Sequence, residues 1–315
     1  MRTHEIKRIG IVGTGVIGAS WAAYYLARGL DVAATDPADG AEGRLRKRVA
    51  ECWPALEQAG LASGASQERL TFSGDLGGAV RGAEFIQENG PERLDIKRDL
   101  IAKIDAAASS EALIATSSSG ILISSIQDAA RHPERVVLGH PFSPPHLIPL
   151  VEVVGGKLTQ PDAIERALAF YTSIGKKPIH LRQEVQGHVA NRLQAALWRE
   201  AFSLVDRGVA SVADIDTAIS HGPGLRWALL GPFLNLELAG GSGGLAHVLE
   251  HLGPLTESLW SDLGSVQQVG DELARKVVDQ VQDLLKSFSL EETVRQRDDI
   301  LLKLLALKAK ADQLP

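Results

Sequence analysis

A glycine-rich turn close to the start of the chain constrains the fold more than any other feature. Residues 9–18 read IGIVGTGVIG, and the pattern G-x-G-x-x-G is formed by Gly13, Gly15 and Gly18. The apolar residues before the turn predict a buried strand, and residues 19–28 predict a helix. In such a unit the first glycine allows a tight turn, the second lets the backbone approach a pyrophosphate, and the third lets the helix pack on the strand. The helix N-terminus, at Val16 and Ile17, then offers unpaired N–H groups to the phosphates.

A carboxylate ends the next predicted strand, which covers residues 30–35. Asp36 lies 18 positions after Gly18. An acidic side chain at this point accepts hydrogen bonds from a ribose 2′-hydroxyl and repels a 2′-phosphate. The pattern therefore predicts a dinucleotide-binding turn that takes NAD rather than NADP. The alternative is a strand–turn–helix corner that binds no nucleotide.

The length of the chain and the order of its predicted elements indicate two domains. At 315 residues the chain is long for a single hydrophobic core. Residues 1–185 alternate apolar runs with helical stretches, which is typical of an α/β, Rossmann-like domain with a mostly parallel sheet. Residues 186–315 show helical patterns only and predict an all-α domain whose apolar faces suit a homodimer.

The predicted elements follow from these patterns. Strands are expected at 9–12, 32–35, 85–87, 113–116, 136–139 and 150–154. Helices are expected in the first domain at 16–29, 41–60, 93–108 and 161–175. In the second domain they are expected at 189–207, 214–219, 244–252, 273–288 and 290–307.

The composition excludes several classes of partner. A net charge of −6 argues against a surface for nucleic acid or anionic membrane. The single cysteine, Cys52, excludes an intramolecular disulfide and fits a reducing compartment. Residues 1–8 are polar, unlike a signal peptide, and no apolar run is long enough to span a bilayer. We therefore expect a cytoplasmic protein that acts on a small molecule.

Three polar segments interrupt the apolar pattern at or beside strand ends. The segments are TSSSG at 116–120, GHPFSPP at 139–145 and LVEVV at 150–154. Glu152 lies inside an apolar strand, and burying an unpaired carboxylate costs several kcal/mol. His140 is the nearest candidate partner in the sequence, because a turn at the prolines 144 and 145 would bring the two strands together.

A paired histidine and glutamate are suited to proton transfer. Neutral imidazole accepts a proton from a hydroxyl while the carboxylate orients the ring and stabilises the imidazolium that forms. Beside bound NAD this chemistry predicts alcohol oxidation, in which a hydride passes to the nicotinamide. From spacing alone two alternatives stay open: His140 caps a strand end, and Glu152 forms an ion pair with an arginine or lysine.

Seven short motifs extend over nearly the whole chain. They are Gly13-x-Gly15-x-x-Gly18, Asp36, Glu88-Asn89-x-x-Glu92, Ser117-Ser118-Ser119, His140-Pro-Phe-x-Pro, Pro149-Leu-Val-Glu152-Val and Gly187-x-x-x-Asn191-Arg192-Leu193. This set resembles the 3-hydroxyacyl-CoA dehydrogenase family, which has a Rossmann-like domain followed by a helical one.

The resemblance implies roles for individual residues. It makes His140 the general base and Glu152 the group that orients it. It also implies that Ser119 and Asn191 donate hydrogen bonds to the C3 oxygen of the substrate, where negative charge develops. The cofactor that it implies is NAD. Glu92 and Lys97 are the implied neighbours of the nicotinamide ribose. We expect Ser117 to be a further cofactor-binding residue.

Two positions depart from the fatty-acyl pattern of the family. Ser143 stands where the family usually has asparagine, and Gly120 replaces the second serine of the usual pair. Residues 222–241 are more similar to the branch that contains gulonate 3-dehydrogenase, with its lambda-crystallin relatives, and carnitine dehydrogenase. Enzymes of that branch oxidise free 3-hydroxy acids rather than CoA thioesters.

A free acid as substrate suggests roles for a cation and several aromatic residues. In this interpretation Arg226 pairs with the carboxylate, and Trp227, Trp198 and Phe142 line a pocket for an alkyl chain or a quaternary ammonium group. The alternative is that the tryptophans belong to the core and that Arg226 is a surface cation.

The sequence therefore predicts an NAD-dependent enzyme that oxidises the 3-hydroxyl of an L-3-hydroxyacyl substrate, in particular a short or polar 3-hydroxy acid. The substrate stays open among 3-hydroxyacyl-CoA, L-gulonate and L-carnitine. The basic run at 44–48 either meets the phosphates of CoA or forms a solvated helix face. A non-catalytic, crystallin-like protein that binds NAD(H) is the alternative from another class.

No metal site is predicted. Residues 247–251 read HVLEH and match the zinc pattern H-x-x-E-H. Five residues match such a pattern by chance often, and no third ligand is evident in the sequence. We expect this pair of histidines on the outer side of a helix or against a dimer partner.

Overall fold

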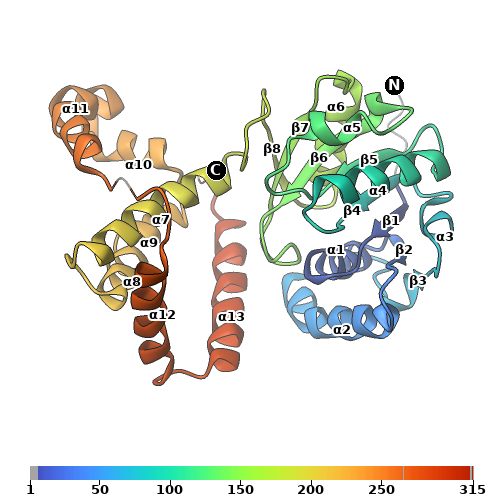
Figure 1. The fold of residues 1–315 in the computed structure, drawn as a ribbon, viewed down its shortest axis with the longest axis horizontal. Helices are drawn as coiled ribbons and strands as arrows, with labels where there is room; N and C mark the ends of the chain where they lie inside the picture. Colours follow the sequence, from blue (N-terminus) through green and yellow to red (C-terminus); the bar gives the residue numbers. More distant parts are fainter. Residues whose placement is uncertain (1–5, 265, 313, 315) are drawn as a thin grey trace. The chain divides into compact units, whose positions relative to one another are not determined.

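The structure is a computed structural model that describes residues 6–264, 266–312 and 314. The chain divides into two compact units, Met1–Arg192 and Leu193–Pro315 (Figure 1). The first unit combines a sheet with helices and the second is helical, so the predicted fold class is confirmed. The domain boundary predicted from the sequence lies a few residues earlier, between residues 185 and 186.

The first unit is built around one eight-stranded sheet. Its strands are β1 (Arg8–Val12), β2 (Asp31–Thr35), β3 (Leu70–Phe72), β4 (Phe85–Glu88), β5 (Leu113–Thr116), β6 (Val136–Pro141), β7 (Leu150–Gly155) and β8 (Lys177–His180). Their order is β3-β2-β1-β4-β5-β6-β7-β8, and every neighbouring pair is parallel except the antiparallel pair β6 and β7. β3 and β8 are not predicted from the sequence. Both are short edge strands that lack a continuous apolar run, which is the signal that identifies buried strands.

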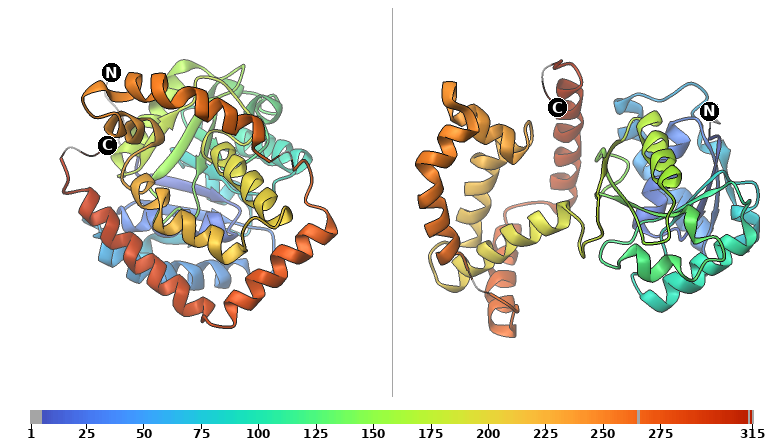
Figure 2. Two further views of the ribbon diagram at one scale, coloured as in Figure 1. Left: turned by 90° about the vertical axis from the view of Figure 1, so that its left-hand side faces the viewer. Right: turned by 90° about the horizontal axis from the view of Figure 1, so that it is seen from above.

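Helices cover both faces of this sheet (Figures 1 and 2). They are α1 (Val16–Ala27), α2 (Ala41–Ala59), α3 (Leu76–Val80), α4 (Leu94–Ala107), α5 (Ile123–Gln127) and α6 (Pro161–Ser173), with short 3-10 turns at Gln67–Arg69 and Pro133–Arg135. One core cluster holds Trp21 of α1 and Leu45 of α2. A second cluster on the opposite face holds Ile101 of α4 and Ile126 of α5. The strands are buried on both sides, which explains why the central ones read as continuous apolar runs.

The carboxyl ends of the central strands meet at one edge of the sheet. Val12 of β1 is in register with Glu88 of β4, and Glu88 is in register with Thr116 of β5. The chain then continues from β6 into β7 through a hairpin in which His140 pairs with Glu152. The loops that follow these strands, where ligands of open α/β sheets bind, hold most of the predicted site residues.

The second unit contains helices and no strand among its described residues. The helix α7 (Ala190–Asp206) crosses the boundary, and the others are α8 (Val212–His221), α9 (Pro223–Trp227), α10 (Pro232–Ala239), α11 (Gly244–Asp262), α12 (Asp271–Leu285) and α13 (Leu290–Lys308). α9 and α10 are not predicted from the sequence. Each begins with a proline at its first helical position, after a glycine, and this pair of residues is typical of a loop. The helix expected at 244–252 continues to Asp262 through Pro254.

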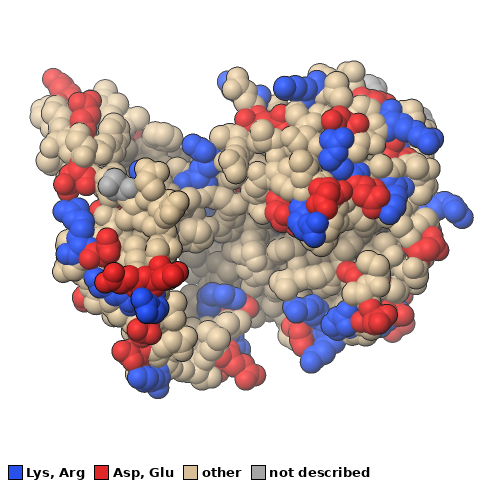
Figure 3. Space-filling view, in the orientation of Figure 1, with Lys and Arg blue, Asp and Glu red and all other residues tan. Residues whose placement is uncertain are grey.

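Few apolar side chains of the second unit are buried. Those that are include Val205 and Leu302, whereas Phe233, Leu238 and Trp260 are 72%, 68% and 66% exposed. No helix among the described residues has the length and hydropathy needed to cross a membrane. On the face drawn in Figure 3, basic and acidic side chains lie intermixed, and neither sign forms a continuous stripe.

Candidate active site

His140 and Glu152 are direct hydrogen-bond partners. The antiparallel register of β6 and β7 places the two residues opposite each other. Nδ1 of His140 lies 2.9 Å from Oε2 of Glu152, and the two residues are 6% and 0% exposed. An ionised carboxylate only accepts hydrogen bonds, so Nδ1 carries the proton and Nε2 is left as the basic atom of the neutral ring.

The carboxylate of Glu152 is held ionised by its remaining contacts. Its Oε1 accepts hydrogen bonds from the backbone N–H groups of Val189 and Ala190, at 2.8 and 3.0 Å. Burial by itself raises the pKa of this carboxyl group. The hydrogen bonds from His140 and from the two amides outweigh that effect and hold the pKa of Glu152 below its usual value.

Ser119 and Asn191 lie side by side at the start of α7. Nδ2 of Asn191 is 3.5 Å from the backbone oxygen of Ser119. Ser119 is exposed and Asn191 is half-buried, so the hydroxyl and the amide are open to a ligand. The structure thus brings together these two predicted substrate contacts in the loop that follows β5 and the turn that follows residue 187.

Glu92 fixes the serine loop from the other side. Its Oε1 accepts hydrogen bonds from Oγ of Ser118 at 2.7 Å and from the backbone N–H groups of Ser119 and Gly120 at 3.0 and 2.9 Å. Partial burial raises the pKa of Glu92, but these hydrogen bonds and the charge of Lys97 outweigh burial and lower it. Glu92 is therefore an anion that organises the loop on which Ser119 sits.

Lys97 is buried in an ion pair. Its ammonium group lies 3.0 and 3.2 Å from the two carboxylate oxygens of Glu88, 3.2 Å from the carbonyl oxygen of Gly90 and 3.7 Å from Glu92. Glu88 also accepts a hydrogen bond from the hydroxyl of Thr116 at 2.6 Å. This network ties the loop after β4 to β5 and sets the position of Glu92.

Ser117 belongs to a second buried network. Nε2 of Gln87 donates to Oγ of Ser117 at 2.8 Å and to the carbonyl oxygen of Gly139 at 3.1 Å. Ser117 donates in turn to Oδ1 of Asn89 at 2.8 Å. Oε1 of Gln87 accepts from the hydroxyls of Tyr25 and Tyr171. Gln87, which the sequence analysis does not identify, therefore links Ser117 to the residue before His140.

The glycine-rich turn fits a dinucleotide. Gly13 has φ 88°, and a Cβ atom on it would lie 2.7 Å from the carbonyl oxygen of Asn89. A Cβ atom on Gly18 would lie 1.9 Å from the carbonyl oxygen of Gly13. A Cβ atom on Gly15 would meet no atom within 4 Å, and no side chain caps the first N–H groups of α1. The turn therefore needs two of its glycines for its own packing and keeps open space over the third, at a helix N-terminus that attracts phosphate.

Asp36 lies against the same turn. Its Oδ2 accepts a hydrogen bond from the backbone N–H of Thr14 at 2.8 Å, and its Oδ1 accepts one from Ala38 at 3.0 Å. These contacts hold the carboxylate at the end of β2 in one orientation. The basic run on α2 is engaged locally: Arg46 pairs with Glu42, and Lys47 lies 3.8 Å from Glu51.

Arg226 and Trp227 lie on α9 of the second unit. Arg226 lines a cavity of about 340 Å³ together with Leu229, Leu230, Asn235, Leu238 and Ala239. Trp198 and Trp227 are 53% and 46% exposed. Neither tryptophan is therefore part of the core of this unit.

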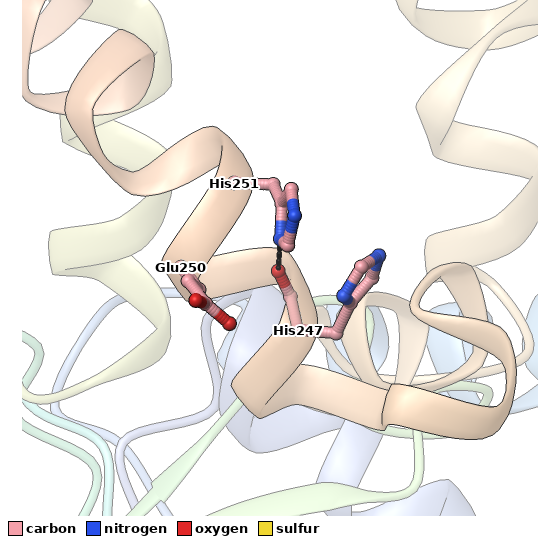
Figure 4. Close-up of side chains that lie close together, drawn as sticks. All are labelled: His247, Glu250 and His251. Atoms are coloured by element: carbon pink, nitrogen blue, oxygen red, sulfur yellow. Dashed lines mark hydrogen bonds between the residues drawn. The ribbon is translucent and has the colours of Figure 1, made fainter.

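The H-x-x-E-H pattern falls on the surface of α11. His247, Glu250 and His251 are exposed, and their ligand atoms lie within 4.8 Å of one another. Figure 4 shows the ring of His251 hydrogen-bonded through Nδ1 to the backbone oxygen of His247, at 3.0 Å. These three side chains could together hold a metal ion, so the absence of a metal site stays a prediction.

His188 is a further residue that the sequence analysis misses. It lies between Gly187 and the apolar Val189, and its ring centroid is 5.0 Å from that of His140. The residue is 2% exposed. A polar ring among glycine and apolar neighbours, at the entry to a helix, is the only sequence signal that marks it.

Family models and relatives match nearly the whole chain. The NAD binding domain of 3-hydroxyacyl-CoA dehydrogenase matches residues 8–185, and the C-terminal domain of the same enzyme matches residues 187–281. An L-carnitine dehydrogenase of Streptomyces griseus is 51% identical over 294 residues, which cover 93% of this chain and 88% of the relative. An L-carnitine dehydrogenase of Bacillus cereus is 48% identical over 310 residues, which cover 98% and 95%.

A solved structure resembles the chain over a similar extent. It is the NAD⁺-dependent dismutase 5-formyl-3-hydroxy-2-methylpyridine 4-carboxylic acid 5-dehydrogenase, which is 33% identical. The TM-score is 0.81, and the match covers 96% of this chain and 97% of the other.

Proposed function

The chain belongs to the 3-hydroxyacyl-CoA dehydrogenase family and is an NAD-dependent oxidoreductase that acts on CH–OH groups, and on that premise we propose that it oxidises the 3-hydroxyl of L-carnitine to the 3-oxo product. The observation that carries this proposal is the group of relatives named L-carnitine dehydrogenase, about half identical to the chain over more than nine-tenths of its length. L-Carnitine is a short, free 3-hydroxy acid, which is the substrate class that the sequence favours.

The His140–Glu152 pair supplies the proton chemistry of this reaction. Bound NAD provides the hydride acceptor. Nε2 of His140 takes the proton from the 3-hydroxyl, while Glu152 holds Nδ1–H and stabilises the imidazolium. The hydroxyl of Ser119 and the amide of Asn191 donate hydrogen bonds to the C3 oxygen as its charge develops. Reduction runs through the same groups, with His140 as the acid.

The cofactor is held by residues at the carboxyl ends of the central strands. We assign the pyrophosphate to the turn formed by Gly13, Gly15, Val16, Ile17 and Gly18. We assign the adenosine ribose to Asp36. The hydrogen bonds that fix its carboxylate support this assignment. Glu92, Lys97 and Ser117 contribute to the nicotinamide side, and the hydrogen bonds of Glu92 to the serine loop link that side to Ser119.

The two ends of L-carnitine call for different groups. Its carboxylate suits the guanidinium of Arg226, which binds such a group through two parallel hydrogen bonds. Its trimethylammonium group suits aromatic faces, and Trp227, Trp198 and Phe142 are the candidates. The exposure of both tryptophans supports this assignment, since neither is used by the core.

We also propose that the protein is a cytoplasmic homodimer that assembles through its helical unit. Leu193, Phe233, Leu238 and Trp260 expose much of their surface in the single chain. Large exposed apolar side chains on one unit support this proposal, because exposed apolar patches are typical of interfaces. Size measurement by light scattering at two concentrations tests the dimer.

A substrate panel tests the function. Purified protein with NAD is offered L-carnitine, D-carnitine, 3-hydroxybutyrate, 3-hydroxybutyryl-CoA and L-gulonate, and NADH is followed by absorbance. We expect kcat/KM for L-carnitine to exceed the values for 3-hydroxybutyrate, 3-hydroxybutyryl-CoA and L-gulonate by about 100-fold or more, because the site pairs with both charged ends. D-Carnitine has the same charged ends and is expected to be a poor substrate, because binding of both ends would turn its 3-hydroxyl away from His140. A higher kcat/KM for the CoA thioester would overturn the assignment of L-carnitine as the substrate. Binding of NADH without oxidation of any alcohol would favour a structural role.

A further inference from the structure

His188 has a backbone conformation that only glycine adopts freely. Its φ is 54°, and among the described residues it is the only non-glycine residue with a positive φ. A left-handed conformation is unfavourable for a non-glycine residue, because its Cβ atom crowds the backbone. The preceding residue, Gly187, is also left-handed, with φ 78°. Such strain persists where the surrounding contacts require the side chain at that point.

The ring of His188 is held in one tautomer. Its Nε2 lies 3.0 Å from the backbone oxygen of Ser118. A carbonyl oxygen only accepts, so Nε2 carries the hydrogen and the ring donates it to Ser118. Nδ1 is buried and has no partner among the described residues. A neutral ring therefore keeps an unshared acceptor, which is a second cost at the same residue.

The strained backbone and the unpaired Nδ1 of His188 occur where three parts of the proposed site meet: the serine loop, the ring of His140 and the amides that bind Glu152. Through Nε2, His188 holds the loop that carries Ser119. Its ring lies against that of His140, with centroids 5.0 Å apart and planes at 49°. The turn that it forms delivers the two N–H groups of Val189 and Ala190 to Glu152. Asn191 lies three residues after His188.

We propose that His188 is a positioning residue that sets the serine loop and the His140 ring in their working geometry while itself staying uncharged. The proposal rests on the function proposed above, because it assigns His140 as the base. It gives a reason for a histidine at a strained position, since the ring spans the distance from the turn to the backbone of Ser118.

The groups that face His188 agree with a neutral ring. Burial lowers its pKa most, the hydrogen bond to Ser118 raises it, and the neighbouring His140 lowers it. Glu152 and Glu92 raise it by smaller amounts. The pKa of His188 lies below its usual value as a result, so a second positive charge does not form beside His140.

Two substitutions separate the ring from the backbone. His188→Gly keeps the left-handed turn without strain and so keeps both amides on Glu152, but it removes the donor to Ser118. His188→Gln keeps an N–H donor at the position of Nε2 but accepts the backbone strain. We expect the Gly variant to lose kcat by about tenfold or more and the Gln variant to stay within about threefold of the parent. KM for the alcohol and Kd for NADH are expected to change by less than about threefold in both.

The outcomes are decisive for the proposal. Equal and near-parental kcat in the two variants would overturn it, and so would a Gln variant as slow as the Gly variant. Loss of NADH binding in parallel with kcat would show that His188 serves the fold only. His180→Gln, at an exposed position of β8, is the control for replacing a histidine without these contacts.

Nitrogen NMR of labelled histidines keeps the proposal testable if no alcohol of the panel is oxidised. His188 is expected as the Nε2–H tautomer, with an uncharged ring at pH 7. An Nδ1–H tautomer, or a His188 ring that is protonated at pH 7, would overturn the proposal. Failure of the substrate panel with the expected NMR result would instead count against the proposed function alone.

Discussion

Glu152 presents one carboxylate oxygen to Nδ1 of His140 and the other to two backbone N–H groups that only donate, those of Val189 and Ala190. The two sides of the carboxylate therefore have different requirements. The amides demand an acceptor, whereas the imidazole side needs an acceptor only because Nδ1 is protonated. This asymmetry makes the pair sensitive to the smallest change in the acid.

Glu152→Gln is predicted to reverse the tautomer of His140. The amides will select the carbonyl oxygen of the glutamine, so its NH₂ group will face Nδ1 and turn that atom into an acceptor. Nε2 then carries the hydrogen and no longer acts as a base. We expect kcat to fall by about 100-fold or more, with nitrogen NMR of His140 reporting the switch. Parental kcat in this variant would contradict the assigned role.

His140→Ala is predicted to abolish most proton transfer and leave the cofactor site intact. We expect turnover of L-carnitine to fall by about 100-fold or more, with Kd for NADH unchanged within about twofold. Steady-state kinetics and fluorescence titration with NADH measure the two effects. A variant that keeps turnover would remove His140 from its role.

Asp36→Ala is predicted to change the choice of cofactor. Loss of the carboxylate removes both the acceptor for the 2′-hydroxyl and the repulsion of a 2′-phosphate. The ratio of kcat/KM for NAD over NADP should therefore fall by about tenfold or more. Asp39→Ala, at an exposed position of the same loop, is the matched control. An equal loss with the two cofactors would mean that Asp36 supports the turn through Thr14 and does not read the ribose.

Arg226→Gln is predicted to weaken the carboxylate contact. We expect KM for L-carnitine to rise by about tenfold or more, with a smaller change in kcat, because the contact is present in both ground and transition states. L-Carnitinamide lacks the charged carboxylate, so its KM should be similar in the parent and in the variant. An unchanged KM for L-carnitine in the variant would show that Arg226 lies outside the substrate site.

Lys176 is predicted to make stability depend on pH. Its ammonium group contacts the backbone oxygens of Pro145 and Ile148 and lies 3.7 Å from the ring centroid of Tyr24, and burial lowers the pKa of Lys176 to about 7. The unfolded chain then binds more protons than the folded one between pH 7 and about 10, so the free energy of unfolding should rise with pH across that window.

Denaturant titrations measure this effect. The slope is expected to reach up to about 1.4 kcal/mol per pH unit and to disappear in Lys176→Met. Lys177→Met changes the exposed neighbour and should leave the slope in place. A slope shared by all three proteins would assign it to other groups.

The sequence predicts the part of the fold that depends on local patterns. The glycine spacing at residues 13–18 identifies β1 and α1 because two of these glycines are needed by the backbone itself. Continuous apolar runs identify the central strands because both faces of the sheet are covered. The edge strands cannot be identified in this way. For example, β8 reads KPIH and has one apolar side chain besides its proline, so it forms no apolar run.

From the residues alone, the site can be predicted only where a residue type has few structural explanations at its position. A glutamate inside an apolar strand requires a partner, and this leads from Glu152 to His140. Glu92 gives no such signal and is identified only through the family resemblance. Its hydrogen-bond donors are the hydroxyl of Ser118 and backbone N–H groups of the loop after β5, and no pattern around Glu92 reveals them. His188 escapes for the same reason, because its partner is the backbone oxygen of Ser118.

The β6–β7 hairpin has a consequence for how the acid–base pair is gained and lost during folding. Only eleven residues separate His140 from Glu152 along the chain, so closing this loop costs little chain entropy. The ladder lies inside the sheet, between β5 and β8. Amide hydrogens of Leu138 and Val154 should therefore exchange with deuterium only through global opening, and the base should remain assembled through every smaller fluctuation of the molecule.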